Sequence, residues 1–223
     1  MIKFHPSEQQ LVEYVAGDLT AAMLMTVGTH VDMCRHCQSH VQDIEEKLAQ
    51  RLFGDVTDLP ARWIANADVM IDEIINAAMP VHRSLSDSDN YLLLEGKRFE
   101  LPATLARNYH RIGSWHKMLG KMWRAPVDLG SGEVLNFIYM GTGAQVPEHT
   151  HRGTEATLVI NGVFVDESDE YRDGDFVLLD GQHKHTPQTQ QEDCLTLATL
   201  DAPLQFTSGI SRLLNPFSSL FFK

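Results

Sequence analysis

The sequence is poor in cysteine, and this shortage limits the chemistry available to it. Its three cysteines are too few for a disulfide framework. Cys34 and Cys37 have the spacing C-x2-C, which predicts metal ligands or a redox pair in a reducing compartment. Cys194 lies in the apolar run CLTLATL and is expected to be a core residue.

Positive charge and long apolar runs are also scarce. Lys and Arg number 18 against 30 Asp and Glu, and the resulting net charge of −12 argues against direct nucleic-acid binding, which needs clustered Lys and Arg. No run approaches the roughly 20 apolar residues that cross a bilayer, and the start MIKFHPSEQQ lacks the apolar core of a signal peptide. We therefore expect a cytoplasmic protein without a membrane partner, and a basic protein as its partner.

The stretch GAQVPEHTHRGTEATLVING, residues 143–162, has the pattern of a metal site in a β-barrel. His149 and His151 are two residues apart, so a strand directs both to one face, where Glu155 of the adjoining strand can meet them. Imidazole and carboxylate groups suit zinc, iron, copper or nickel. The spacing resembles the first metal motif of the cupin superfamily, which consists of small antiparallel β-barrels.

The fourth ligand of this site is expected in the downstream segment DGQHKHTP. The preceding Gly174-Asp175-Phe176 matches the start of a second cupin motif, but the usual Pro-x-Gly turn before the histidine is degenerate here. Both His183 and His185 therefore remain candidates.

The first part of the chain has helical periodicity. Ser7 and Gln10 resemble a capping box, and Gly17 is a natural helix end. Thr20 can cap a second helix, and a third is expected to end at Gly54. Asp58 and Pro60 predict the start of a fourth helix, ARWIANADVMIDEIINAAM.

A second metal site is predicted on these helices. The pattern His30-x3-Cys34-x2-Cys37 supplies three ligands that tetrahedral zinc favours, and His5 is the candidate for the fourth. A thioredoxin-like redox pair is an alternative, although no βαβ pattern surrounds the motif. It also stays open that His30 packs beside inert thiols and that His5 is an ordinary surface residue.

The second part of the chain changes to short apolar runs typical of strands. These are separated by Gly, Asp and Asn turns: LNFIYM, ATLVI, GVFV, DFVLL and CLTLATL. Such spacing predicts a sandwich or barrel. WHKMLGKMWRAP is expected to add earlier strands that cover the barrel mouth.

The opening HP, the H-x3-C-x2-C motif and the cupin motif together resemble the ChrR-type zinc-dependent anti-sigma factors, over essentially the whole chain. The resemblance implies that a helical domain holds one zinc through His5, His30, Cys34 and Cys37 and clamps an extracytoplasmic-function sigma factor. It also implies that a cupin domain holds a second metal and is needed for release under singlet oxygen or related oxidative stress. The fourth cupin ligand of that family resembles the histidine of an H-T-P triplet, which favours His185.

We therefore predict an α+β protein in two domains. An N-terminal all-α zinc-binding bundle spans residues 1–85, a polar linker spans 86–100, and a C-terminal antiparallel β-barrel of the cupin type spans 101–223. The expected function is that of an anti-sigma factor without enzymatic activity, with zinc in both sites, although the barrel site suits another divalent metal as well. A weak homodimer through the C-terminal PFSSLFFK stays open.

Two other functions compete with this hypothesis. Three histidines and a glutamate on a cupin also serve iron or manganese dioxygenases, so a metalloenzyme with an appended zinc module is the alternative. A zinc-binding interaction module that does not sense oxidants is the third.

Overall fold

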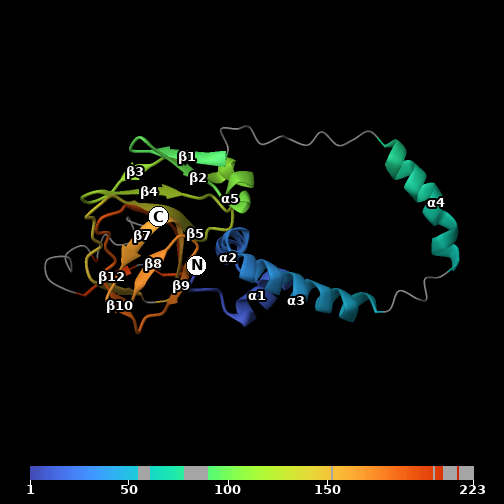
Figure 1. Cartoon of the computed structure of the whole chain (residues 1–223), viewed down its shortest axis with the longest axis horizontal. Coiled ribbons are helices and arrows are strands. Elements are labelled where there is room, and N and C mark those ends of the chain that lie inside the picture. The colour runs from blue at the N-terminus through green and yellow to red at the C-terminus, as the bar shows by residue number, and fades with distance from the viewer. Residues whose placement is uncertain (55–60, 78–89, 152, 203, 208–214, 216–223) are drawn as a thin grey trace.

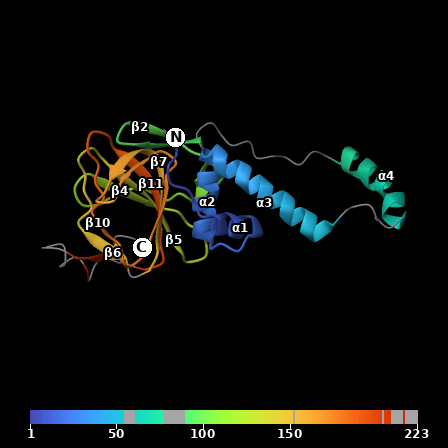
Figure 2. The same cartoon turned by 60° about the horizontal axis from the view of Figure 1, so that its bottom comes forward.

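The computed structural model describes residues 1–54, 61–77, 90–151, 153–202, 204–207 and 215. The strands gather in one body, with α1, α2 and α3 on one side of it (Figure 1). Helix α4 lies apart from both in two views (Figures 1 and 2). Within the described residues, no single helix is long and apolar enough to cross a membrane, and α1 and α2 reach that length only as a pair bent by 111°.

The predicted helix ends Ser7, Gly17, Thr20 and Gly54 are confirmed. Their bounds are α1 Glu8–Ala16, α2 Ala21–Met33, α3 Arg35–Phe53 and α4 Ala61–Asn76. The Ser7 side chain accepts from the backbone N–H of Gln10, the Gln10 side chain accepts from the backbone N–H of Ser7, and Gly17 ends α1 in the left-handed conformation. The Thr20 side chain likewise accepts from a backbone N–H in the first turn of α2. The predicted cap residues Asp58 and Pro60 lie outside the described residues.

The second part is almost entirely antiparallel sheet, as predicted. In chain order its elements are β1 (Tyr91–Leu94), β2 (Lys97–Glu100), α5 (Ala103–Arg107), the short 3-10 helix η3 (Tyr109–Arg111), β3 (His116–Lys117), β4 (Met122–Pro126), β5 (Val134–Met140), β6 (His149–His151), β7 (Glu155–Val165), β8 (Glu170–Arg172), β9 (Phe176–Leu179), β10 (Lys184–His185), β11 (Cys194–Leu200) and β12 (Leu204–Phe206).

These strands form two facing layers and a separate hairpin. The larger sheet has the order β3-β4-β5-β11-β7-β8, with β9 paired to β7, and the smaller one has the order β10-β6-β12. Strand β11 is buried along its whole length, including Cys194, as expected for a core strand. Every pair in both sheets is antiparallel, which is the cupin-type arrangement.

One predicted turn is wrong. The runs ATLVI and GVFV are one continuous strand, β7, because Asn161 and Gly162 pair with Leu195 and Cys194 of β11 instead of forming a turn. The pairing with β11 shifts register between Leu195 and Thr196, as at a β-bulge. Gly162 has a φ of 94°, and a Cβ atom there would lie 1.9 Å from the Asp193 carbonyl oxygen, so only glycine fits.

Part of the predicted linker is structured. Residues 91–100 form the hairpin β1–β2, whose Leu92, Leu94 and Phe99 are buried. The Lys97 ammonium group pairs with the buried Asp193 carboxylate at the start of β11, which fixes the hairpin to the barrel. The predicted domain limits stay a prediction, but this hairpin belongs to the folded body.

Helices α1 and α2 share one continuous apolar core with the barrel. Leu11 and Val27 lie in the same buried cluster as Leu158 and Leu197 of the large sheet. Polar contacts reinforce this interface, since the Glu133 carboxylate accepts from the backbone N–H of Ala22 at 2.7 Å, at the N-terminus of α2. Helices α1 and α2 are therefore docked on the barrel.

Candidate metal centres

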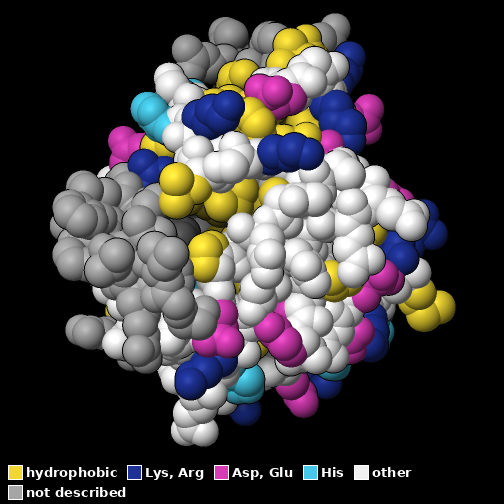
Figure 3. All heavy atoms as spheres, turned by 90° about the vertical axis from the view of Figure 1, so that its left-hand side faces the viewer, with side chains coloured by type: hydrophobic (Ala, Val, Ile, Leu, Met, Phe, Trp, Pro, Cys, Tyr) yellow, Lys and Arg dark blue, Asp and Glu magenta, His cyan; other side chains and the backbone are white. Residues whose placement is uncertain are grey.

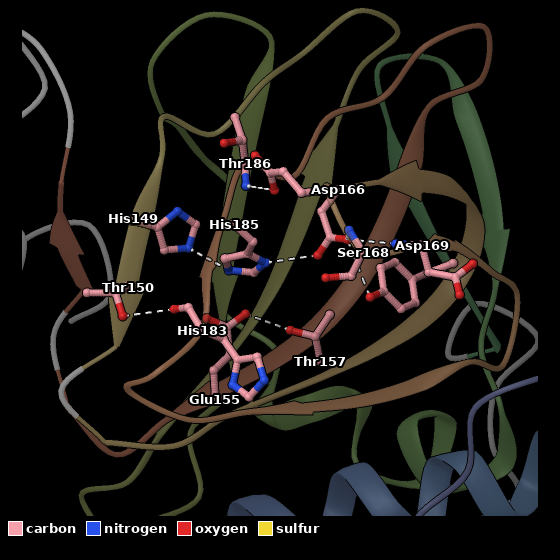
Figure 4. A network of polar contacts seen from close by, with 12 residues as sticks. His149, Thr150, Glu155, Thr157, Asp166, Ser168, Asp169, His183, His185 and Thr186 are labelled. Carbon is pink, nitrogen blue, oxygen red and sulfur yellow. Dashed lines mark hydrogen bonds and ion pairs between the residues drawn. The ribbon is translucent and has the colours of Figure 1, made fainter.

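The barrel brings four predicted ligands together. His149 and His151 of β6, Glu155 of β7 and His185 of β10 each present one ligand atom, and these atoms all lie within 4.8 Å of one another. Strand alternation sends His149 and His151 inward, and the pairing of β10 with β6 sets His185 opposite His149. All three histidines are buried. Figure 4 shows His149 and His185 pointing toward each other.

The hydrogen bonds of these histidines leave their Nε2 atoms as acceptors. His149 Nδ1 lies 2.9 Å from the Pro147 carbonyl oxygen, which can only accept, so Nδ1 carries the proton. His185 Nδ1 lies 3.3 Å from the Asp166 carboxylate and donates to it in the same way. The Nε2 atoms of His149 and His185 are nevertheless 3.0 Å apart. Two lone pairs this close repel unless a cation lies between them, so the donor set fits a metal ion.

Glu155 completes the set with negative charge. Its Oε2 atom lies 3.1 Å from His151 Nδ1, but the angles at these two atoms do not allow a hydrogen bond between them. Its Oε1 atom accepts from Thr157 Oγ1 at 2.8 Å, which orients the carboxylate. Burial lowers the pKa of His149 to about 4 and also lowers the pKa of His151, so both rings are neutral and able to bind a metal at pH 7.

Sequence reasoning missed Asp166, whose carboxylate accepts a hydrogen bond from Nδ1 of His185. Its side chain is 2% exposed, and it also accepts from the backbone N–H groups of Ser168 and Asp169. Although burial favours its neutral form, the hydrogen bond from His185 and these two backbone bonds lower its pKa. Asp166 lies 19 residues before His185, and no spacing in the sequence connects the two.

His183 lies outside this group. Its exposed side chain contacts Asp180 Oδ1 at 2.8 Å, at the surface turn before β10. Of the two candidates in DGQHKHTP, the structure therefore brings His185 to the other three residues, whereas the His183 side chain is exposed.

The helical region brings the second predicted set together. His5, His30, Cys34 and Cys37 present ligand atoms within 4.8 Å of one another. Cys37 Sγ lies 3.2 Å from His30 Nε2 and 3.5 Å from His5 Nδ1, and Cys34 Sγ lies 3.4 Å from His5 Nδ1. Two sulfurs and two nitrogens are a set that tetrahedral zinc prefers.

The hydrogen bonds of this second set also leave a ligand atom free for a metal. His30 Nδ1 donates to the Gly174 carbonyl oxygen at 2.8 Å, so its Nε2 atom faces the cysteines as an acceptor. Burial lowers the pKa of His30 to about 4. Burial and the neighbouring Cys34 raise the pKa of Cys37 to about 12, so a metal must displace the thiol proton when it binds.

Comparisons with known proteins agree with this architecture. Residues 111–205 match the family model of the ChrR cupin-like domain. The chain is 30% identical to the anti-sigma-E factor ChrR of Cereibacter sphaeroides over 222 residues, which cover 97% of this chain and 98% of that protein. The crystal structure of Rhodobacter sphaeroides SigE in complex with the anti-sigma ChrR matches with a TM-score of 0.66 and 27% identity, over 90% of this chain and 100% of the matched chain.

The similarity extends over both halves of the chain and includes the helices as well as the barrel. It favours a non-enzymatic regulator over the metalloenzyme alternative. The chain therefore belongs to the family of ChrR-type anti-sigma factors.

Proposed function

We propose that this protein sequesters an extracytoplasmic-function sigma factor in the cytoplasm and releases it under singlet oxygen or related oxidative stress. The helical region makes the contact with the sigma factor, and each of the two metal centres holds zinc. The family relationship supports the sigma factor as the partner, because the related crystal structure contains SigE bound to ChrR.

The single observation that carries the proposal is the apolar surface of α4. Five of its apolar side chains are between 51% and 72% exposed: Val69, Met70, Ile71, Ile74 and Ile75. Ile71, Ile74 and Ile75 have the i, i+3, i+4 spacing of one helical face. Exposing such a face to water is unfavourable, which is typical of a surface that a protein partner covers. The same region of the chain exposes Leu52 and Phe53 at the end of α3.

The helical zinc would hold the platform from which α4 extends. His30 from α2, Cys34 and Cys37 at the start of α3 and His5 before α1 would bind one ion and fix the angles between these three helices. In zinc-finger peptides, binding of such an ion contributes apparent free energies of about 10–16 kcal/mol, so its loss would loosen the helical region.

The barrel metal would be held by His149, His151, Glu155 and His185. Zinc bound there supplies a Lewis acid without redox chemistry, and an oxidant would act on the ligands or on the protein around them. The chain's own residues hold the ligands in place: Pro147 and Asp166 fix the ring orientations of His149 and His185.

Co-expression tests the partner directly. We expect the full chain and the extracytoplasmic-function sigma factor encoded beside it to elute together in size-exclusion chromatography. Ile74→Asp with Ile75→Asp should separate them, because charge on the apolar face of α4 opposes burial. Glu73→Gln, on the same helix, is the matched control and should leave the complex intact. Separate elution of the unmodified proteins would contradict the proposal.

A further inference from the structure

The barrel contains an internal cavity beside its four clustered ligands. The cavity has a volume of about 90 Å³ and lies between the two sheets. One end is polar, where His149, Glu155, Asp166 and His185 reach it. The rest of its wall is almost entirely apolar. A wall with one polar end and apolar sides is typical of sites for small organic molecules.

Three methionines line one part of the apolar wall. Met122 of β4 and Met140 of β5 are directly paired across the sheet, both are buried, and both line the cavity together with Met118. Methionine side chains are unbranched and polarisable, so a wall made of them adapts to the shape of an apolar ligand. Phe164 and Phe206 add aromatic surface to the same wall.

The cavity reaches the surface at the turn between β3 and β4. Leu119 lines the cavity and is nevertheless 52% exposed, so a molecule can enter beside it. Hydrophobic side chains gather in a hollow on the barrel face that lies away from the helices (Figure 3). Leu119 therefore places this end of the cavity next to the surface.

We propose that this cavity binds a small, uncharged and mainly apolar molecule that carries one oxygen-containing group, such as a short alcohol or ketone. The oxygen-containing group lies at the polar end, and the hydrocarbon part lies against the methionines. This proposal concerns the barrel alone and does not depend on the binding of a sigma factor.

Charge and size define the class of ligand. A charged head group is disfavoured because a divalent ion in the cluster balances the carboxylates of Glu155 and Asp166, which leaves this end of the cavity without net charge. An ammonium group would lose its hydration among apolar walls. A cavity of about 150 Å³ holds benzene, so the volume of about 90 Å³ here suits about four or five non-hydrogen atoms.

Methionine-methyl NMR of the full, metal-loaded chain tests the proposal with 1-butanol as the probe. We expect the methyl signals of Met118, Met122 and Met140 to shift and saturate, while those of Met23, Met25 and Met33 in α2 stay unchanged. Butylammonium and butanoate, with the same hydrocarbon chain, should cause no such shifts. No shift with butanol, equal shifts of all methionines, or a response to butanoate alone would overturn the proposal.

Two neighbouring residues of β9 provide matched variants. Val177 lines the cavity, whereas the next residue, Leu178, does not line it and is 45% exposed. Val177→Phe should weaken butanol binding by about tenfold or more because the ring occupies the space of the ligand. Leu178→Phe should leave butanol binding unchanged.

A variant with a larger cavity provides a second test in case Val177→Phe does not fold. Val177→Ala should move the best-binding alcohol from butanol toward hexanol, because the removed methyl groups leave more room. If Val177→Ala keeps the same preference for chain length, or if Leu178→Phe weakens binding as much as Val177→Phe, the ligand does not occupy this cavity and the proposal fails.

Discussion

His30 of the helical metal cluster donates a hydrogen bond from Nδ1 to the carbonyl oxygen of Gly174, 144 residues later in the barrel, at 2.8 Å. Gly174 directly precedes Asp175 and β9. The other end of β9, Leu179, is paired with Glu155, and both of these residues line the barrel cavity. One short strand thus connects the surroundings of the two candidate metal clusters.

The Asp175 side chain adds a second bond at this junction. Its Oδ1 atom accepts from the backbone N–H groups of Lys3 at 2.6 Å and of Phe4 at 3.0 Å. The segment that carries His5 is therefore held on the barrel by the residue next to Gly174.

Loss of one cysteine ligand should remove one metal ion. Cys37→Ser exchanges a strong thiolate ligand for a weak hydroxyl, so we expect the zinc content of the purified chain to fall from two equivalents to one and the helical signal in circular dichroism to decrease. Elemental analysis by mass spectrometry gives the count. Cys194→Ala is the control, because Cys194 is buried in β11 away from both clusters and its loss should leave two equivalents. An unchanged count in Cys37→Ser would contradict the assignment of this cluster.

Asp166 should tune the barrel centre without binding the metal. Asp166→Asn keeps the shape of the side chain but removes the charge that orients and polarises His185, and we expect metal affinity to fall by about tenfold to a hundredfold. Competition with a chelator of known affinity measures the change. Asp180→Asn is the matched control, since Asp180 makes the same kind of contact with His183, which lies outside the cluster. Equal losses in both variants would mean that the effect is general and not specific to His185.

Gly162 should not tolerate a side chain. Gly162→Ala combines a positive φ with a collision against the Asp193 carbonyl, and we expect the free energy of unfolding to fall by about 2–5 kcal/mol. Gly130→Ala separates the two effects, because Gly130 has a φ of 69° but no other group within 4 Å of the position that a Cβ atom would take. Gly130→Ala should lower the free energy of unfolding by only about 1–2 kcal/mol. Urea unfolding of both variants measures the difference, and similar losses would show that the close approach is relieved by local movement.

Because of Asp193, the free energy of unfolding should depend on pH in the acidic range. Burial favours its neutral form, but hydrogen bonds from Lys97 and Tyr139 lower its pKa below the ordinary value of 3.8. A lowered pKa in the folded state stabilises the protein above the ordinary pKa, and this contribution is lost as the pH falls through the folded-state pKa. The stability difference between the unmodified chain and Asp193→Asn should therefore be largest above about pH 4 and shrink below it. Urea unfolding across this range measures it, and a difference that grows toward low pH would have the wrong sign.

The local features of this fold could be predicted from the sequence, and those set by distant contacts could not. The capping residues Ser7, Thr20 and Gly17 mark helix ends because capping depends on neighbours within a few residues. The sequence predicts a turn at Asn161 and Gly162 instead of a continuous strand, because the pairing with β11 and the close approach of the Asp193 carbonyl to Gly162 come from a distant part of the chain. It predicts a linker instead of the hairpin β1–β2, because these short, partly polar strands are fixed by Asp193 and by the core.

In the candidate site, too, local features could be predicted from the sequence and features set by distant contacts could not. Ligand types and spacing marked His149, His151 and Glu155, because strand alternation alone places them. Spacing could not separate His183 from His185, since the difference between them arises at the turn after Asp180, which ends before β10 begins. Asp166 carries no signal of its own, and the sequence marks Gly174 only as part of the second cupin motif and not as the hydrogen-bond partner of His30. A carboxylate or a carbonyl oxygen supports a ligand only through the fold.

The four candidate ligands of the helical cluster all lie between His5 and Cys37 in the sequence. The Gly174 carbonyl oxygen, which orients His30, comes 144 residues after His30. During synthesis on the ribosome, the amino-terminal helices emerge first and can capture an ion while the barrel does not yet exist. The bond from His30 to the Gly174 carbonyl can form only after residue 174 has been synthesised, so the final orientation of the His30 ring is set late in folding.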